Sequence, residues 1–136
     1  MAKRLIAGDN LLLFPEGTSS DGKKVLPFQS SLFSLAESSE INTNLIMQPI
    51  TLAYTGLNGL PVGLNERPIF AWFGEMSLIY HILNLLLAGP AEASIIFHEA
   101  ETISKFSSRK ELSERCEDVI SDGLSKAISG RLGVQK

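Results

Sequence analysis

The sequence is short of the features that mark several classes of protein. Its single cysteine, Cys116, allows no internal disulfide and no cysteine cluster for a metal. The formal net charge of −3 gives no basic field, which argues against nucleic acid as a partner. No apolar run reaches the roughly 18–20 residues that cross a bilayer, and no signal-peptide pattern follows Met1. These absences predict a soluble or membrane-surface protein of a reducing compartment, with no metal and no bound cofactor.

What is present fits one α/β domain with a real core, since 44% of the 136 residues are hydrophobic. Short apolar runs predict strands at residues 11–14, 45–52 and 93–97. Helical periodicity predicts helices at residues 28–38 and 76–88, and a third helix after residue 108. A capping box, Ser108 with Glu111, opens this last helix. Its apolar face consists of Leu112, Cys116, Val119, Ile120, Leu124, Ala127 and Ile128, so Cys116 is interpreted as a packing residue.

The first residues of the chain resemble the end of a helix and not its start. Residues 2–7 have the composition of a last helical turn, followed by Gly8 as the terminating residue. The strand at residues 11–14 is apolar on both faces and needs neighbours that the preceding residues do not supply. Either the start is frayed, or the chain begins inside a larger domain whose N-terminal half is missing.

The stretch after this strand, residues 15–24, is the strongest candidate for a binding loop. It brings an acid, a glycine and three hydroxyl residues to the carboxyl end of a buried strand, where open α/β sheets bind ligands. Residues 17–23 also spell G-x-x-x-x-G-K, close to a nucleotide-binding P-loop. The P-loop hydroxyl is replaced by Lys24, and Pro27 favours an extended chain where a helix should begin. We therefore set nucleotide binding aside.

Residues 14–18, with the sequence FPEGT, resemble the third sequence block of the PlsC-like glycerophosphate and lysophospholipid acyltransferases. Gln48-Pro49-Ile50 after an apolar run resembles the fourth block, and residues 71–76 resemble a segment common in bacterial members. The resemblance covers nearly the whole chain but only the second half of the family's domain. It implies a mixed, partly parallel sheet flanked by helices, with residues 1–136 forming a single partial domain. The implied reaction moves a fatty acyl group from acyl-CoA or acyl-carrier protein to a lysolipid hydroxyl in phospholipid biosynthesis.

The same resemblance implies which residues bind the acceptor. Glu16, Gly17 and Thr18 belong to the block that holds the headgroup, although Glu16 could instead cap amides of its own loop. The family usually has an arginine next, which would grip a phosphate bidentately, but this chain has Ser19. Lys23 or Lys24 could supply the charge. Glycerol-phosphate acceptors are the first expectation, and lysolipids with other headgroups, including amino-acid lipids, come close behind.

The family's catalytic pair, a histidine and an aspartate in the pattern H-x-x-x-x-D, is absent from this sequence. Five residues beyond His81 is Leu86, and five beyond His98 is Ile103. His81 is expected to be packed or interfacial. His98 and Glu99 could form a base–carboxylate pair, but are expected at the surface because adjacent strand side chains point to opposite faces. The chain alone is therefore expected to be inactive, and the alternative is a non-catalytic lipid-binding or interaction module.

Two further segments bear on where the protein works. Residues 54–68 carry three glycines and two prolines and predict a long loop. The helix at residues 76–88 is apolar nearly all round, and is either a core helix or an interfacial one. Trp72, Phe73 and Tyr80 suit a bilayer interface. The second possibility places the protein peripherally on the cytoplasmic face of the membrane. Six acids are expected on solvated surfaces: Glu37, Glu40, Glu111, Glu114, Glu117 and Asp118.

Overall fold

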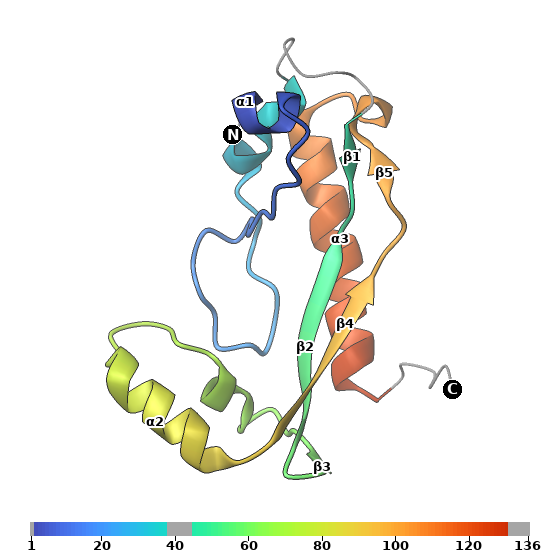
Figure 1. The fold of residues 1–136 in the computed structure, drawn as a ribbon. Helices are drawn as coiled ribbons and strands as arrows, with labels where there is room; N and C mark the ends of the chain where they lie inside the picture. The colour runs from blue at the N-terminus through green and yellow to red at the C-terminus, as the bar shows by residue number, and fades with distance from the viewer. Residues whose placement is uncertain (1, 38–44, 131–136) are drawn as a thin grey trace.

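The computed structural model describes residues 2–37 and 45–130. Two long antiparallel strands, β2 (Ile50–Leu57) and β4 (Ala91–Phe97), form its centre, and the long helix α3 (Arg109–Ile128) runs along them (Figure 1). The strand β3 (Leu60–Pro61) pairs with the end of β2 and completes a sheet in the order β3-β2-β4. A second small sheet pairs β1 (Ile46–Met47) with β5 (Glu101–Thr102). This is the expected mixture of helices and sheet.

The predicted parallel component of the sheet does not occur within residues 2–37 and 45–130. All three strand pairings there are antiparallel. The predicted strand at residues 45–52 is split in two, and Pro49 lies at the break between β1 and β2. A proline cannot donate to a sheet ladder, and this explains why the pairing partner changes there from β5 to β4. Pro49 therefore divides the apolar run into two strands.

The strand predicted at residues 11–14 is wrong. This segment pairs with no strand of the described chain, and Leu12 and Phe14 are 73% and 75% exposed. Leu13, in contrast, packs against the core. An extended apolar run becomes a strand only where another strand supplies its hydrogen bonds, and none lies beside it here. The preceding helical turn is confirmed as α1 (Ala2–Ile6), and Gly8 has a φ of +90°.

The core lies between α3 and the short 3₁₀ helices η1 (Ser30–Glu37) and η3 (Ile103–Lys105). Its buried members are Phe33, Ile103, Leu112 and Cys116. Cys116 is therefore a packing residue, as expected, and burial raises the pKa of its thiol to about 11. The predicted helix at residues 28–38 is present only as η1, which begins at Ser30.

The start of α3 is confirmed together with its cap. The Ser108 hydroxyl accepts a hydrogen bond from the Glu111 amide at 3.2 Å. The Glu111 carboxylate accepts from the Ser107 amide at 2.8 Å and from the Ser107 hydroxyl at 2.6 Å. These bonds favour the charged form and lower the pKa of Glu111. The amides of Ser107 and Glu111 thus both have side-chain acceptors, and these bonds define where α3 begins.

The long loop predicted at residues 54–68 is largely wrong. β2 continues to Leu57, and a two-residue turn at Asn58 and Gly59 leads into β3. These two residues have φ angles of +54° and +77°, the signature of a tight hairpin turn. The 3₁₀ helix η2 (Arg67–Phe70) then follows. The Asn-Gly pair was the signal in the sequence for this hairpin.

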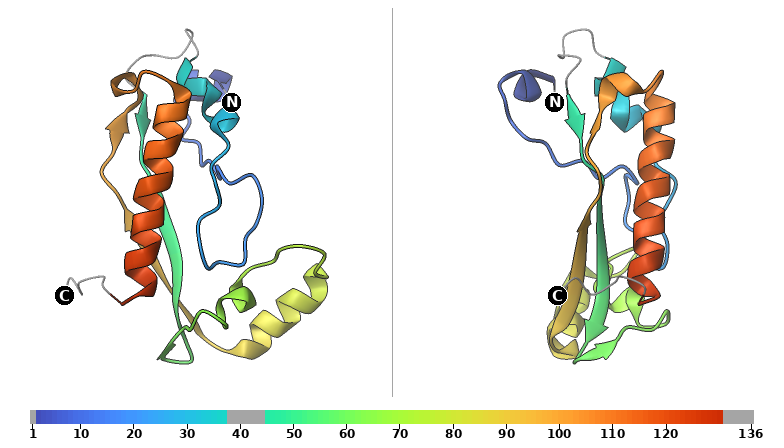
Figure 2. Two further views of the ribbon diagram at one scale, coloured as in Figure 1. Left: turned by 180° about the vertical axis from the view of Figure 1, so that it is seen from behind. Right: turned by 90° about the vertical axis from the view of Figure 1, so that its right-hand side faces the viewer.

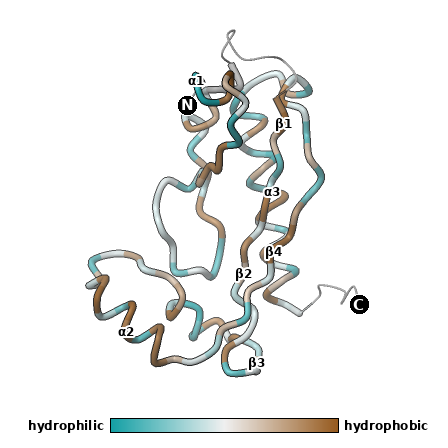
Figure 3. Tube along the Cα trace, in the orientation of Figure 1, coloured by the Kyte–Doolittle hydropathy of each residue, from teal (hydrophilic) through white to brown (hydrophobic). Residues whose placement is uncertain are grey.

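The apolar helix is α2 (Leu78–Ala88), and it ends at Gly89, whose φ is +98°. The core interpretation is wrong for most of this helix, because Ile79, Leu86 and Leu87 are 72%, 74% and 85% exposed. His81 alone is buried, as the packed interpretation predicted. Figure 3 shows the helix as a mostly hydrophobic segment to one side of the strands. Within residues 2–37 and 45–130, no helix has the length and apolar character to cross a membrane.

Candidate functional site

The FPEGT sequence forms a tight turn around Gly17. The Gly17 amide donates to the Phe14 carbonyl at 3.2 Å, and Gly17 has a φ of +69°. Glycine adopts this left-handed conformation without steric cost. A Cβ at this position would lie 2.9 Å from Cδ of Gln29, so a larger residue here would also displace the Gln29 amide group. The left-handed backbone conformation explains why a glycine is found here.

Three hydrogen bonds close the neck of the loop. The Gln29 amide donates to the Pro15 carbonyl at 2.8 Å, and Nε2 of Gln29 donates to the Glu16 carbonyl at 3.3 Å. Oε2 of Glu16 accepts from the Leu26 amide at 3.0 Å. The Glu16 carboxylate thus caps an amide of its own loop. Residues 15–29 form a closed loop (the FPEGT loop) whose two ends are bonded to each other.

The FPEGT loop is anchored on α3 and on the core. The Phe28 amide donates to Oε2 of Glu117 at 2.8 Å. The solvated position expected for Glu117 is wrong, since its carboxylate satisfies a loop amide. Leu13 before the loop and the Phe28 ring at its end both pack against the core cluster. The ends of the loop therefore keep their positions relative to the helix.

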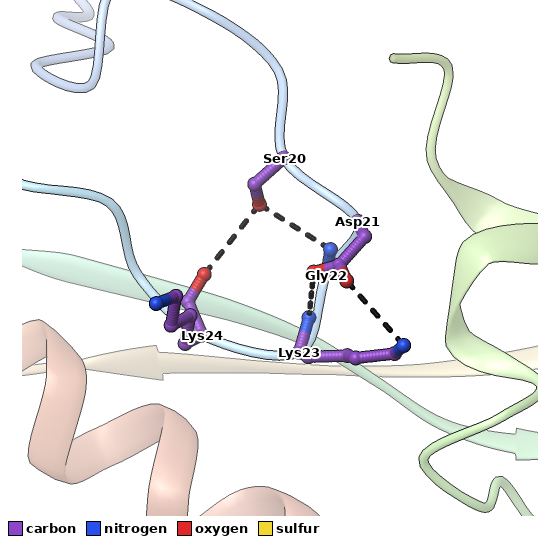
Figure 4. A network of polar contacts seen from close by, with 5 residues as sticks. All are labelled: Ser20, Asp21, Gly22, Lys23 and Lys24. Atoms are coloured by element: carbon purple, nitrogen blue, oxygen red, sulfur yellow. Dashed lines mark hydrogen bonds and ion pairs between the residues drawn. The ribbon is translucent and has the colours of Figure 1, made fainter. Parts of the chain in front are cut away.

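The far end of the loop is a second turn, residues 20–24, which Figure 4 shows from close by. The Ser20 hydroxyl accepts from the Gly22 amide at 3.3 Å and donates to the Lys24 carbonyl at 3.5 Å. The Asp21 carboxylate accepts from the Lys23 amide at 3.1 Å, and its other oxygen lies 3.5 Å from Nζ of Lys23. The positive charge of Lys23 is therefore balanced by Asp21 within the same turn.

The predicted acceptor-binding residues thus come together on one loop. Between the two turns, Thr18 and Ser19 are exposed, while Glu16 is partly buried at the neck. Two hydroxyls and the second carboxylate oxygen of Glu16 are polar groups suited to a headgroup with hydrogen-bond donors. The binding roles of Glu16, Gly17, Thr18, Ser19 and Lys23 stay predictions.

The two histidines lie apart from this chemistry. His81 is buried on α2. His98 is partly buried, and its ring bonds to Thr51 at 2.8 Å, so the surface position expected for it is wrong. No hydrogen bond or ion pair joins His98 to Glu99 in the described residues. Those residues also contain no group of three or more His, Cys, Asp or Glu side chains arranged to hold a metal.

Sequence reasoning missed Arg67, which organises the hairpin beside the loop. Its guanidinium is buried and donates to the carbonyls of Tyr54 and Val62, each at 3.3 Å. Burial lowers the pKa of Arg67. A Cβ on Gly22 would lie 3.8 Å from the Arg67 carbonyl oxygen, so the second turn of the FPEGT loop lies next to η2. No local pattern in the sequence marks an arginine that donates to backbone carbonyls of β2 and of the segment after β3.

Three known relatives of this chain all carry the same name. The chain is 38% identical over 134 residues to the lyso-ornithine lipid O-acyltransferase of Rhizobium meliloti (strain 1021), a match that covers 96% of the chain and 46% of the relative. It is 35% identical over 134 residues to the enzyme of the same name from Brucella abortus (strain 2308), covering 96% and 50%. For Rhodobacter capsulatus the identity is 35% over 124 residues, covering 90% and 43%. No family model and no solved structure matches the chain. The chain spans about half the length of these curated relatives.

Proposed function

Because the chain belongs to the PlsC-like glycerophosphate and lysophospholipid acyltransferase family, as a partial domain, we propose that it is the acceptor-binding part of a lipid O-acyltransferase. The reaction transfers a fatty acyl group from acyl-CoA or acyl-carrier protein to a lysolipid hydroxyl. The observation that carries the proposal is the closed FPEGT loop, which displays Thr18 and Ser19 in a chain matched to O-acyltransferases over 96% of its length.

The acceptor we favour is lyso-ornithine lipid or a similar amino-acid lysolipid. Ser19 stands where the family usually has a phosphate-gripping arginine, and the charge of Lys23 is balanced by Asp21. Both features suit a headgroup that is not recognised through a phosphate. A cationic amino group on the headgroup would find an acceptor in the Glu16 carboxylate. The names of the relatives point to the same acceptor class. This order reverses the expectation from sequence alone, which put glycerol-phosphate acceptors first.

In this proposal the chain corresponds to the second half of the family's domain. The catalytic base would then belong to the first half, outside this chain. A histidine of the H-x-x-x-x-D block would take the proton of the acceptor hydroxyl as its oxygen attacks the thioester carbonyl. Donors at the carbonyl oxygen would stabilise the developing negative charge, and the thiol of the donor would leave. The FPEGT loop contributes by holding the headgroup, which limits the positions that the hydroxyl can adopt.

The experiment compares the chain alone with a chimera that adds the unmatched part of the Rhizobium meliloti relative. Acyl transfer to lyso-ornithine lipid is measured with acyl-CoA and with acyl-carrier protein as donors. Because loss of a general base typically lowers the rate by ~10²–10⁴, we expect no measurable turnover by the chain alone and turnover by the chimera. Replacing the histidine of the chimera's H-x-x-x-x-D block by alanine is the control.

Two outcomes would contradict parts of the proposal. Robust transfer by the 136-residue chain alone would show that the base is within it. A folded chimera that binds lyso-ornithine lipid without transferring an acyl group would favour the alternative, a non-catalytic lipid-binding module.

A further inference from the structure

The two long strands have an apolar face that no helix of the described residues covers. In the register of β2 and β4, Ile50 lies opposite Phe97 and Leu52 lies opposite Ile95. Leu52, Ile95 and Phe97 are 56%, 58% and 65% exposed, and Ile50 is 36% exposed. The right-hand view in Figure 2 shows α3 along one side of the strands and no helix along the middle of the other. We call these four side chains the open face.

The pattern of the strands is that of a sheet covered on both sides. Thr51 and Ala53 of β2 point the other way and are almost fully buried on the α3 side. An antiparallel sheet with one face in water normally places polar residues at the outward positions. Here the outward positions are isoleucine, leucine and phenylalanine, paired directly across the strands. Contiguous exposed apolar side chains of this kind mark a surface that binds something.

We propose that the open face is the docking surface for a helical layer from the other half of the acyltransferase domain. The relatives matched here are about twice as long as this chain, so each carries a comparable length of polypeptide beyond the match. Helices on both faces of a central sheet are a standard way to bury two apolar faces. The inference rests on family membership and the geometry of the sheet, and does not depend on the proposed reaction.

A lipid surface fits this face less well than a protein layer. β4 is an edge strand of the sheet, whose order is β3-β2-β4. Immersing the open face in hydrocarbon would carry the unpaired amides and carbonyls of that edge toward lipid, where each unsatisfied group costs several kcal/mol. A packed protein layer buries the side chains and leaves the edge free to pair or to meet water.

Cysteine labelling can test this directly, because the native chain has a silent background. Cys116 is only 4% exposed, and burial raises the pKa of its thiol to about 11. Leu52→Cys and Ile95→Cys place a thiol on the open face, and Leu86→Cys on α2, at a position 74% exposed, is the matched control. Maleimide reaction rates are compared between the chain alone and the chimera with the unmatched part of the Rhizobium meliloti relative, with the cysteines of that part replaced by serine.

In the chain alone we expect all three thiols to react rapidly. In the chimera the thiols at positions 52 and 95 should react about tenfold or more slowly, since a covered side chain reacts only through local opening. The thiol at position 86 should keep its rate. A thermal melt of each variant reports folding independently of labelling and of activity.

Four outcomes would overturn the inference. The first is a chimera that melts cooperatively but leaves position 52 reactive. The second is protection at position 86 in place of positions 52 and 95, which would show that the added part covers α2. The third is a chimera without a cooperative melt, which would show that the open face does not recruit the added part. The fourth is slow labelling of the chain alone with a dimer mass in light scattering, which would make the occupant a second copy.

Discussion

Nε2 of His98, at the end of β4, lies 2.8 Å from the hydroxyl oxygen of Thr51 on the neighbouring strand. The single hydroxyl hydrogen of Thr51 is donated to the Ile120 carbonyl of α3 at 3.1 Å. Thr51 must therefore accept from His98, which places the ring hydrogen on Nε2. These two hydrogen bonds connect β2 to the end of β4 and to α3. Gly123 of α3 lies directly against both side chains.

Gly123→Ala is expected to destabilise the fold although alanine is the better helix former. The added Cβ would lie 2.6 Å from the Thr51 hydroxyl oxygen and 2.7 Å from Cε1 of His98. Thr51 is almost fully buried and cannot move away, so overpacking of about 1–3 kcal/mol outweighs the gain of ~1 kcal/mol in helix propensity. Chemical denaturation measures the change in the free energy of unfolding.

Two controls isolate the contact at Gly123. Ser121→Ala, at an exposed position of the same helix, should be neutral or stabilising. In a Thr51→Ala background the cost of Gly123→Ala should shrink, because the clashing oxygen is gone. An equal cost in both backgrounds would show that the close approach to Thr51 is not the cause.

The stability of the fold should fall as the pH drops below the ordinary histidine value of 6.5. Burial lowers the pKa of His98, Lys126 lowers it further, and Asp122 opposes them. The folded state therefore disfavours the protonated ring, and the unfolded state binds the proton first. The stabilisation is complete above pH 6.5 and is lost as the pH falls from 6.5 through the lower folded-state pKa.

His98→Gln provides the comparison for this pH dependence, since its amide can still donate to Thr51 but does not titrate. The wild-type unfolding free energy should decline more steeply between pH 6.5 and pH 5 than that of the variant. Parallel pH profiles for the two proteins would contradict the prediction.

Glu16→Gln should impair acceptor use without loosening the FPEGT loop. The glutamine oxygen can still accept from the Leu26 amide, a contact of 3.0 Å in the native loop, so the melt should be unchanged. Loss of a charged partner for the headgroup should lower kcat/KM of the chimera about 10-fold or more. Leu26→Met, which keeps the same backbone donor, is the matched control. Equal kinetics for the two variants would show that Glu16 only caps its loop.

Sequence patterns correctly predicted the features of the fold that depend on residues close together in the chain. The Ser108–Glu111 capping box marks the start of α3, and the apolar face containing Cys116 lies in the core. Each depends on residues within one or two helical turns, and the sequence displays them together. The FPEGT sequence likewise marked a loop that the structure closes and anchors.

The wrong predictions concern residues whose structure depends on contacts with residues far away in the sequence. Residues 11–14 have the composition of a strand but no strand beside them. His98 was expected at the surface by strand alternation, but its environment is set by Thr51 and Gly123. Gln29 closes the neck of the FPEGT loop from 13 residues away. The missed hairpin at Asn58 and Gly59 is different, because its turn signal was present in the sequence.

The α2 helix is expected to bind the membrane surface, where the proposed lysolipid acceptor would reside. Seven of its large apolar side chains are exposed: Leu78, Ile79, Tyr80, Ile82, Leu83, Leu86 and Leu87. Trp72 precedes the helix, and its Nε1 donates to the Met76 carbonyl at 2.7 Å. This bond orients the Trp72 ring, and tryptophan is enriched at bilayer interfaces. The helix has the sequence LIYHILNLLLA, with no lysine or arginine. Binding should therefore arise from apolar burial and not need anionic lipid.

Leu87→Lys tests this interpretation, because the Leu87 side chain is 85% exposed and its replacement should leave the fold intact. Full burial of a leucine is worth ~1.5–3 kcal/mol, so vesicle binding should weaken about tenfold or more while the thermal melt stays unchanged. Leu60→Lys on β3, at a position 70% exposed, is the control and should bind as the native chain does. Binding is measured by sedimentation with neutral phosphatidylcholine vesicles and repeated with vesicles containing an anionic lipid. Absence of native binding to neutral vesicles, or equal loss in both variants, would contradict membrane binding through α2.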